Sequence, residues 1–305
     1  MMKYTPLSIV RFLQKSQYLF LVIIVALACL HLYQVSTVSF RLDKELVRNT
    51  GSEFLSISTL FWGAALSLIW QKRQTLKLES GVFSSFLGIA LIALAVFGSI
   101  FLPPKNNDFL QNDDFLHISP FISAIGVALM ASGVKGLKQY WRELLLFFVL
   151  IIPVEELLPH MANLDVLTAR FANFLLVHFG FDASSHGAVV ALPTGAVEVD
   201  PGCSGLRAIT RLLQLSALIL VMLPTKPSAK IIVPIVAILI AFTINSIRVA
   251  ILALLIANSH RKAFDFWHDG TGSHGISLVS VLALWLLCQL LVKQDEPEQE
   301  QQGQG

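Results

Sequence analysis

Long apolar segments recur along almost the whole chain, and they restrict its possible folds more than any other feature. A helix needs about 20 predominantly apolar residues to cross a bilayer. Of the 305 residues, 55% are hydrophobic and only 14% are charged, whereas a soluble domain carries about 25% charged residues. We expect an all-α fold, a polytopic bundle of about eight transmembrane helices. The predicted spans cover residues 18–38, 55–70, 81–102, 119–134, 143–159, 203–224, 231–257 and 274–292.

The distribution of Lys and Arg predicts the orientation of these spans. The segments on the side of the two termini carry more Lys and Arg than those on the other side, although the first outer loop is itself basic. The positive-inside rule therefore places both termini in the cytoplasm. The apolar segment Tyr18–Val38 is too long for a cleaved signal peptide, so we expect it to be an uncleaved first span.

This layout predicts the domain organisation. A cytoplasmic N-terminus (1–17) precedes the first five spans (18–159), and an extracytoplasmic connection (160–202) leads to the last three spans (203–292). A polar tail, residues 293–305, is expected to be disordered and cytoplasmic.

The connection before the last three spans is too long for a simple turn. Its first half, Leu164–Phe181, has apolar residues at helical spacing and predicts a helix in the plane of the membrane interface. Its second half, Ala188–Val199, reads as a short extended stretch. A structural cap over the bundle and a platform for a substrate both fit this connection.

Charge and cysteine content argue against several classes of protein. The net charge of +2 is far from the strongly basic charge that is typical of a nucleic-acid-binding protein. The three cysteines lie far apart, and the sequence has no Cys-x-x-Cys pair and no Cys/His cluster at zinc spacing. We therefore expect no metal site and no organic cofactor.

Cys203 differs from the other two cysteines in its surroundings. Cys29 and Cys288 lie inside apolar stretches, where a thiol usually acts as a small hydrophobic group. Cys203 instead stands at the predicted start of a helix, whose partial positive charge favours a thiolate. A lone cysteine at the end of a span is more often structural, so its interpretation as a nucleophile depends on partner groups.

Charged residues surround Cys203 in the sequence. Arg207, four residues later, would share its helix face and stabilise a thiolate, whereas Glu198 and Asp200 would oppose that effect.

Arg248 lies within a predicted span, and Asn245 precedes it by three residues on the same helix face. Ionisable groups inside a membrane are costly and mark functional sites, although an arginine near a helix end can also reach the interface.

Two histidines follow in the last outer segment. His268 lies in the loop and His274 begins the last span; alone, either is an ordinary interfacial residue. Cys203, Arg248 and His268, however, come from three consecutive helix ends on one predicted face. Together they would supply a nucleophile, an oxyanion stabiliser and a proton shuttle for acyl transfer.

At these residues the sequence resembles the exosortase/archaeosortase family, and the cyanobacterial exosortases in particular. The resemblance covers roughly residues 140–292, and the first four spans match only in hydropathy. The motifs that carry it are Pro201-Gly202-Cys203-Ser204-Gly205-Leu206-Arg207, Asn245-Ser246-Ile247-Arg248, and His268 followed by Gly272.

The resemblance implies a cysteine transpeptidase or protease in the cell membrane, with its site on the extracytoplasmic side. Its substrates would be exported proteins whose C-terminal sorting signal has a Pro-Glu-Pro-type motif (PEP-CTERM), a transmembrane helix and a basic cluster. Cys203 would attack the carbonyl of the motif and form a thioester, Arg248 would stabilise the oxyanion, and His268 would move protons. The acceptor, whether water, an amine or a lipid, stays open. Supporting roles would fall to Arg207, Asn245, His274, Ser204 and Gly205, with His274 an alternative to His268 and Arg207 to Arg248.

Parts of the sequence also bear on other functions. Glu155-Glu156 resembles the start of the Glu-Glu-x-x-x-Arg pattern of intramembrane glutamic proteases, but His160 stands where that pattern needs arginine, so we reject it. These two carboxylates and Glu198 could instead contact a substrate. A transporter with Asn245 and Arg248 along an anion path would spread polar groups through several spans, whereas here they cluster at outer helix ends. A non-catalytic factor that binds the same signals stays an alternative.

Overall fold

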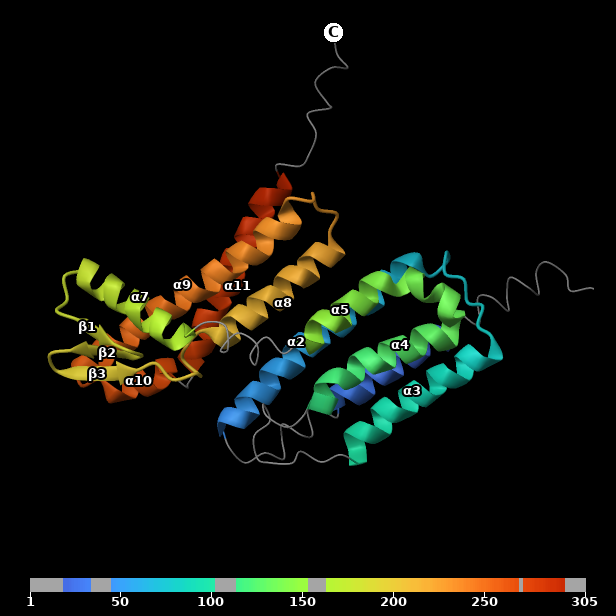
Figure 1. The fold of residues 1–305 in the computed structure, drawn as a ribbon, viewed down its shortest axis with the longest axis horizontal. Coiled ribbons are helices and arrows are strands. Elements are labelled where there is room, and N and C mark those ends of the chain that lie inside the picture. Colours follow the sequence, from blue (N-terminus) through green and yellow to red (C-terminus); the bar gives the residue numbers. More distant parts are fainter. Residues whose placement is uncertain (1–18, 34–44, 102–113, 153–162, 269–270, 294–305) are drawn as a thin grey trace, which may run out of the picture. The chain divides into compact units, whose positions relative to one another are not determined.

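The computed structural model describes residues 19–33, 45–101, 114–152, 163–268 and 271–293 (Figure 1). These residues are mostly helical, which agrees with the sequence prediction. The chain divides into two compact units, Met1–Ile152 and Pro153–Gly305, and each is described by itself.

The regular elements described in the N-terminal unit are all helices. An apolar helix, Leu19–Tyr33, comes first. The following elements are α2 (Glu45–Lys72), α3 (Val82–Phe101), α4 (Asp114–Gly136), the 3₁₀ helix η1 (Leu137–Tyr140) and α5 (Trp141–Ile151). Helix α4 packs against both α3 and α5, and α2 packs against α5 (Figure 1).

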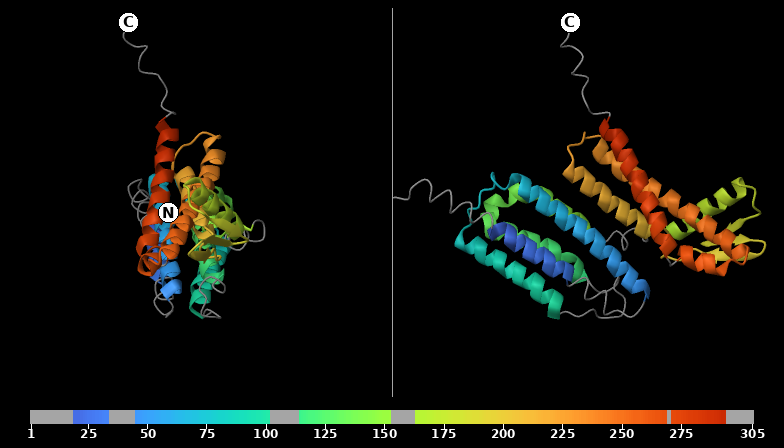
Figure 2. Two further views of the ribbon diagram at one scale, coloured as in Figure 1. Left: turned by 90° about the vertical axis from the view of Figure 1, so that its left-hand side faces the viewer. Right: turned by 180° about the vertical axis from the view of Figure 1, so that it is seen from behind.

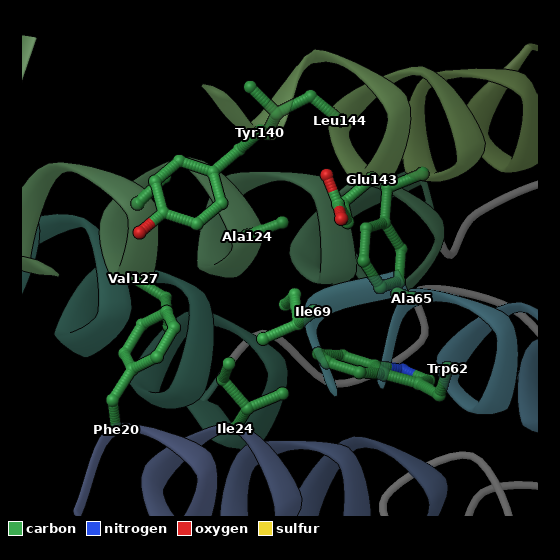
Figure 3. A pocket seen from close by; sticks show the side chains of 12 residues that line it. Phe20, Ile24, Trp62, Ala65, Ile69, Ala124, Val127, Tyr140, Glu143 and Leu144 are labelled. Atoms are coloured by element: carbon green, nitrogen blue, oxygen red, sulfur yellow. The ribbon is translucent and has the colours of Figure 1, made fainter. Parts of the chain in front are cut away.

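A small apolar cavity lies inside this unit (Figure 3). Its lining includes Glu143, whose Oε2 lies 2.8 Å from Nζ of Lys72. The carboxylate is almost fully buried, and a buried charge of this kind requires an opposite charge nearby. We therefore assign Lys72 and Glu143 a structural role that joins α2 to α5.

Within the described residues, three segments are long and apolar enough to cross a membrane: Ile118–Ile151, Ala229–Ala257 and Gly272–Leu290. Gly133, with φ of +65°, interrupts the first of them, so that α4 and α5 are separate helices packed against each other. The predicted spans 119–134 and 143–159 overlap these two helices, and residues 153–159 lie outside the described part of the chain. The protein is a helical membrane protein, while the count of eight spans and the cytoplasmic termini stay predictions.

The C-terminal unit is built around one long helix, α9 (Ala229–Ala257). It packs against α7, α8, α10, α11 and the strand β3. Figures 1 and 2 show these elements gathered along α9, with the strands at its C-terminal end. The helices that surround α9 are α7 (Leu164–His178), α8 (Leu206–Met222), α10 (Arg261–His268) and α11 (Thr271–Lys293).

The unit also contains a small antiparallel sheet, which corrects the all-α prediction. Its strands are β1 (Ser184–His186), β2 (Val189–Leu192) and β3 (Gly195–Glu198), in the order β1-β2-β3. The predicted extended stretch, Ala188–Val199, forms the β2–β3 hairpin because its valines favour strands. Val190, Val197 and Val199 are buried beside Ala250 and Ala253 of α9.

The predicted interfacial helix forms as α7 and ends at His178. Small residues, Ala169 and Ala172, face the core, whereas Leu167, Phe174 and Val177 are exposed. A helix that presents large apolar side chains to its surroundings is suited to a membrane surface. Its position in the interface stays a prediction.

Candidate active site

Cys203 lies in a tight turn between β3 and α8. Its backbone N–H donates to the carbonyl oxygen of Asp200 at 3.0 Å and to Oδ1 of the same residue at 2.7 Å. Asp, Pro and Gly at positions 200–202 are residues that favour such a turn. The prediction that Cys203 opens a helix is therefore wrong, because α8 begins only at Leu206. The argument that Arg207 shares a helix face with Cys203 fails for the same reason.

Neighbouring helices hold this turn in place. The side-chain amide of Asn245, on α9, donates from Nδ2 to the carbonyl oxygen of Cys203 at 2.8 Å. Thr168, on α7, donates from Oγ1 to the carbonyl oxygen of Ser204 at 2.9 Å. Ser204 in turn donates from Oγ to the carbonyl oxygen of Pro201 at 2.8 Å. These hydrogen bonds give the Cys203 side chain, which is 5% exposed, a defined position.

Gly205 allows Asn245 to approach the turn. It caps α8 with φ of +88°, a conformation that favours glycine. A Cβ atom at this position would lie 2.8 Å from Nδ2 of Asn245. A side chain at Gly205 would therefore push Asn245 away from the carbonyl group of Cys203.

Gly205→Ala is expected to destabilise the protein more than Gly180→Ala. Gly180 has a similar φ of +86° with open space around it, so alanine there meets only the backbone strain of about 1 kcal/mol. At Gly205 the lost hydrogen bond to Cys203 roughly doubles that loss. Thermal unfolding of the two purified variants in detergent measures the difference. Equal losses would contradict the role of Gly205 in positioning Asn245.

His268 is the last residue of α10, and its Nε2 lies 2.9 Å from Sγ of Cys203. The ring of Phe264, one helical turn earlier, stacks on the imidazole with ring centroids 5.0 Å apart and an interplanar angle of 12°. This stacking restricts the orientation of the His268 ring. His274, the other predicted candidate, lies exposed in the first turn of α11.

Arg248 holds the backbone at the end of α10. Its Nε donates to the carbonyl oxygen of Trp267 at 3.3 Å, and its Nη2 donates to that of His268 at 2.5 Å. The last carbonyl groups of a helix lack helical partners and attract a cation. Among the described residues, no partner is found for the other three N–H groups of Arg248. Asn245 and Arg248 thus bind the two segments that carry Cys203 and His268.

The structure explains why the motif has glycine at position 272, four residues after His268. It lies in the first turn of α11, and a Cβ atom there would lie 2.7 Å from the ring of Phe266. The close approach of α10 and α11 at this point requires a residue without a side chain.

Two of the remaining predicted residues lie in described elements, and two lie outside the described part of the chain. Arg207 is half-buried in the first turn of α8, and Glu198 is exposed at the end of β3. Glu155 and Glu156 lie outside the described residues.

Sequence reasoning missed the roles of Asp200, Thr168 and Phe264. The Asp-Pro-Gly sequence before Cys203 and the four-residue spacing of Phe264 from His268 were available signals for two of them. No local signal in the sequence identifies Thr168.

Asp200, Cys203 and His268 could also be read as metal ligands, because one ligand atom of each lies within 4.8 Å of the others. Zinc bonds of about 2.3 Å to sulfur and 2.0 Å to nitrogen, at a tetrahedral angle, separate those two atoms by about 3.5 Å. The observed distance of 2.9 Å between Sγ and Nε2 is shorter. The arrangement fits a hydrogen-bonded thiol and imidazole better than a preformed metal site.

A thiol that is hydrogen-bonded to an imidazole is the arrangement of a nucleophile with its general base. This arrangement suits acyl transfer. In a comparison with protein families, the model of a family described as transmembrane exosortase matches residues 48–286. No curated protein and no solved structure matches the chain.

Proposed function

Because the chain belongs to the transmembrane exosortase family, we propose that it is a membrane-embedded cysteine transpeptidase for C-terminal sorting signals of exported proteins. The observation that carries the proposal is the 2.9 Å contact between Sγ of Cys203 and Nε2 of His268. The positive-inside distribution of Lys and Arg favours an active site on the extracytoplasmic side of the cell membrane. The likeness to cyanobacterial exosortases stays a prediction, since the match is to the whole family.

The first half-reaction forms a thioester. His268 takes the thiol proton, and the thiolate of Cys203 attacks the carbonyl carbon of the scissile peptide bond. The new C–S bond moves the carbonyl electrons onto oxygen, which gives a tetrahedral oxyanion. When the C–N bond breaks, the imidazolium of His268 protonates the leaving amine.

The second half-reaction releases the sorted protein. His268 removes a proton from the acceptor, which attacks the thioester carbonyl, and the C–S bond then breaks to restore the Cys203 thiolate. Water as acceptor gives proteolysis, whereas an amine or a lipid hydroxyl gives transfer.

Arg248 has two roles in this proposal. Its hydrogen bonds to the carbonyl oxygens of Trp267 and His268 position the histidine. Its other guanidinium N–H groups are available to stabilise the oxyanion, whose charge develops in the transition state and is complete in the tetrahedral intermediate.

The test uses the full-length protein in detergent with a tagged substrate that carries a Pro-Glu-Pro-type motif, a transmembrane helix and a basic cluster. Intact-mass measurement of the tag is expected to show loss of the C-terminal helix, and the product mass identifies the acceptor. After acid quenching, peptide mapping is expected to find a hydroxylamine-sensitive adduct on Cys203.

Two results would count against the proposal. A substrate that stays intact across several motif variants but binds the protein would support a non-catalytic assembly factor. An acyl adduct on a residue other than Cys203 would remove the proposed nucleophile.

Chelation and metal addition test the alternative interpretation of the Asp200, Cys203 and His268 cluster as a metal site. We expect processing to continue unchanged in excess EDTA. Added Zn²⁺ is expected to inhibit at micromolar concentration, because thiolate, imidazole and carboxylate are its preferred ligands, and EDTA should reverse this inhibition. Loss of activity in EDTA with recovery on Zn²⁺ addition would instead indicate a metal-dependent enzyme.

A further inference from the structure

The outer edge of β3 runs directly into the turn that carries Cys203. We propose that this edge binds the substrate, by pairing as a β-strand with the extended peptide segment beside the scissile bond. The inference rests on the proposed function and adds where and how the peptide binds.

The register of the sheet shows which backbone groups of β3 face outward. The N–H of Val199 donates to the carbonyl oxygen of Ala188 at 2.9 Å, so Val199 directs its backbone groups toward β2. Because that direction alternates along an antiparallel strand, Val197 and Gly195 also face β2. Ala196 and Glu198 therefore direct their N–H and C=O groups to the outer edge. Among the described residues, no other strand pairs with this edge.

The outer edge ends next to the candidate active site. Asp200 follows Glu198 by two residues, which span about 7 Å in an extended chain. A carboxylate oxygen of Asp200 lies within 4.8 Å of Sγ of Cys203 and of a ring nitrogen of His268. A peptide strand paired with Ala196 and Glu198 would therefore continue toward the thiol.

Helix α9 holds β3 in place without covering its two outward residues. Thr194 donates from Oγ1 to the carbonyl oxygen of Ala257 at 2.7 Å, and Gly195 packs closely against Ile256. The side chains of Ala196 and Glu198 are exposed. A preformed edge binds a peptide with little ordering of the protein itself.

The spacing of the outward N–H and C=O groups of Ala196 and Glu198 indicates which conformation of a bound peptide fits this edge. Donors and acceptors that repeat at every second residue match an extended peptide backbone, whereas a helix uses these groups internally. The occupant is therefore the extended motif of the sorting signal, and its main-chain groups provide the contacts.

Ala196→Pro tests the inference, because proline removes the outward N–H and is tolerated on a free strand edge. We expect KM to rise on the order of tenfold with kcat largely retained. The matched control is Ser185→Pro on the opposite edge. Ser185 lies opposite Val190 of β2, and Val190 lies opposite Val197 of β3. The backbone groups of Val190 bond to β3 and not to β1, so the N–H of Ser185 faces the outer edge of the sheet. This control should leave KM unchanged.

A second measurement changes the substrate instead of the protein. Peptides with a single N-methyl group, moved along the non-proline residues of the motif and its flanks, are expected to bind wild type weakly only at alternate positions. The Ala196→Pro variant keeps the carbonyl acceptors of residues 196 and 198, so the same alternate positions of the peptide should stay sensitive to methylation in it. Thermal unfolding checks that both proline variants stay folded.

The outcomes separate this inference from the proposed function. If wild type does not process the substrate, the proposed function itself fails. If wild type processes it but both proline variants share its KM, or Ala196→Pro changes only self-association, the strand-pairing inference is overturned and the proposed function stands. N-methyl effects at every position or at none would also overturn the inference.

Discussion

Replacing Cys203 with alanine is expected to abolish processing, with a fall in kcat of roughly 10⁴-fold or more. Sγ of Cys203 is the only protein atom in the proposed mechanism that forms a thioester bond to the substrate. Alanine has no group that can replace it. The backbone of the turn should persist, because its hydrogen bonds to Asp200 and Asn245 use main-chain atoms of residue 203. Substrate binding should therefore remain while cleavage is lost.

Serine at position 203 and alanine at the other cysteines are the controls for this prediction. Cys203→Ser should also be almost inactive, because a hydroxyl is a much weaker nucleophile than a thiolate near neutral pH. Cys29→Ala and Cys288→Ala should process substrate normally, since both cysteines lie on apolar helices. Gel and mass measurement of the tagged substrate give the rates. Processing by Cys203→Ser at the wild-type rate would rule out the mechanism.

His268→Gln is expected to lower kcat on the order of 10³-fold. Glutamine can still form a hydrogen bond to Sγ of Cys203, but it cannot take the thiol proton or protonate the leaving amine. The loss should therefore appear mainly in kcat rather than in KM. The rate at which iodoacetamide alkylates Cys203 should fall in the same variant, because less thiolate forms without the base.

His274→Gln is the matched control for the histidine prediction. His274 lies in the first turn of α11, shortly after His268 at the end of α10. A general effect of removing an interfacial histidine would therefore appear in both variants. We expect its kcat and its alkylation rate to equal those of wild type. An inactive His274→Gln with an active His268→Gln would assign the proton shuttle to His274.

Several parts of the site could be predicted because they depend on local sequence. The three-residue spacing of Asn245 and Arg248 places both on one face of α9, and the structure shows both binding the segments around Cys203 and His268. The extended stretch before Cys203 follows from its valines. The start of α8 was misplaced, because apolar content does not reveal that Asp200 and Gly205 delay the helix by a turn.

The partners of each polar group could not be predicted. The sequence suggested an oxyanion-stabilising role for Arg248, but it did not indicate that this side chain donates to the carbonyl oxygens of Trp267 and His268. Thr168 bonds the backbone of Ser204 across 36 residues of sequence. Such bonds depend on how α7, α9 and α10 pack, which no local pattern contains.

The sequence by itself determined that this protein is helical and membrane-embedded, and it singled out the motifs that we propose carry its chemistry. These properties depend on apolar length, helical period and motif spacing, which are local. Only the tertiary structure decided that Sγ of Cys203 meets Nε2 of His268 across 65 residues of sequence. It also showed that an edge of β3, which pairs with no other strand in the described part of the chain, ends beside them. The physical reason is that packing around α9 brings distant segments together, and only that packing sets the distances on which reactivity depends.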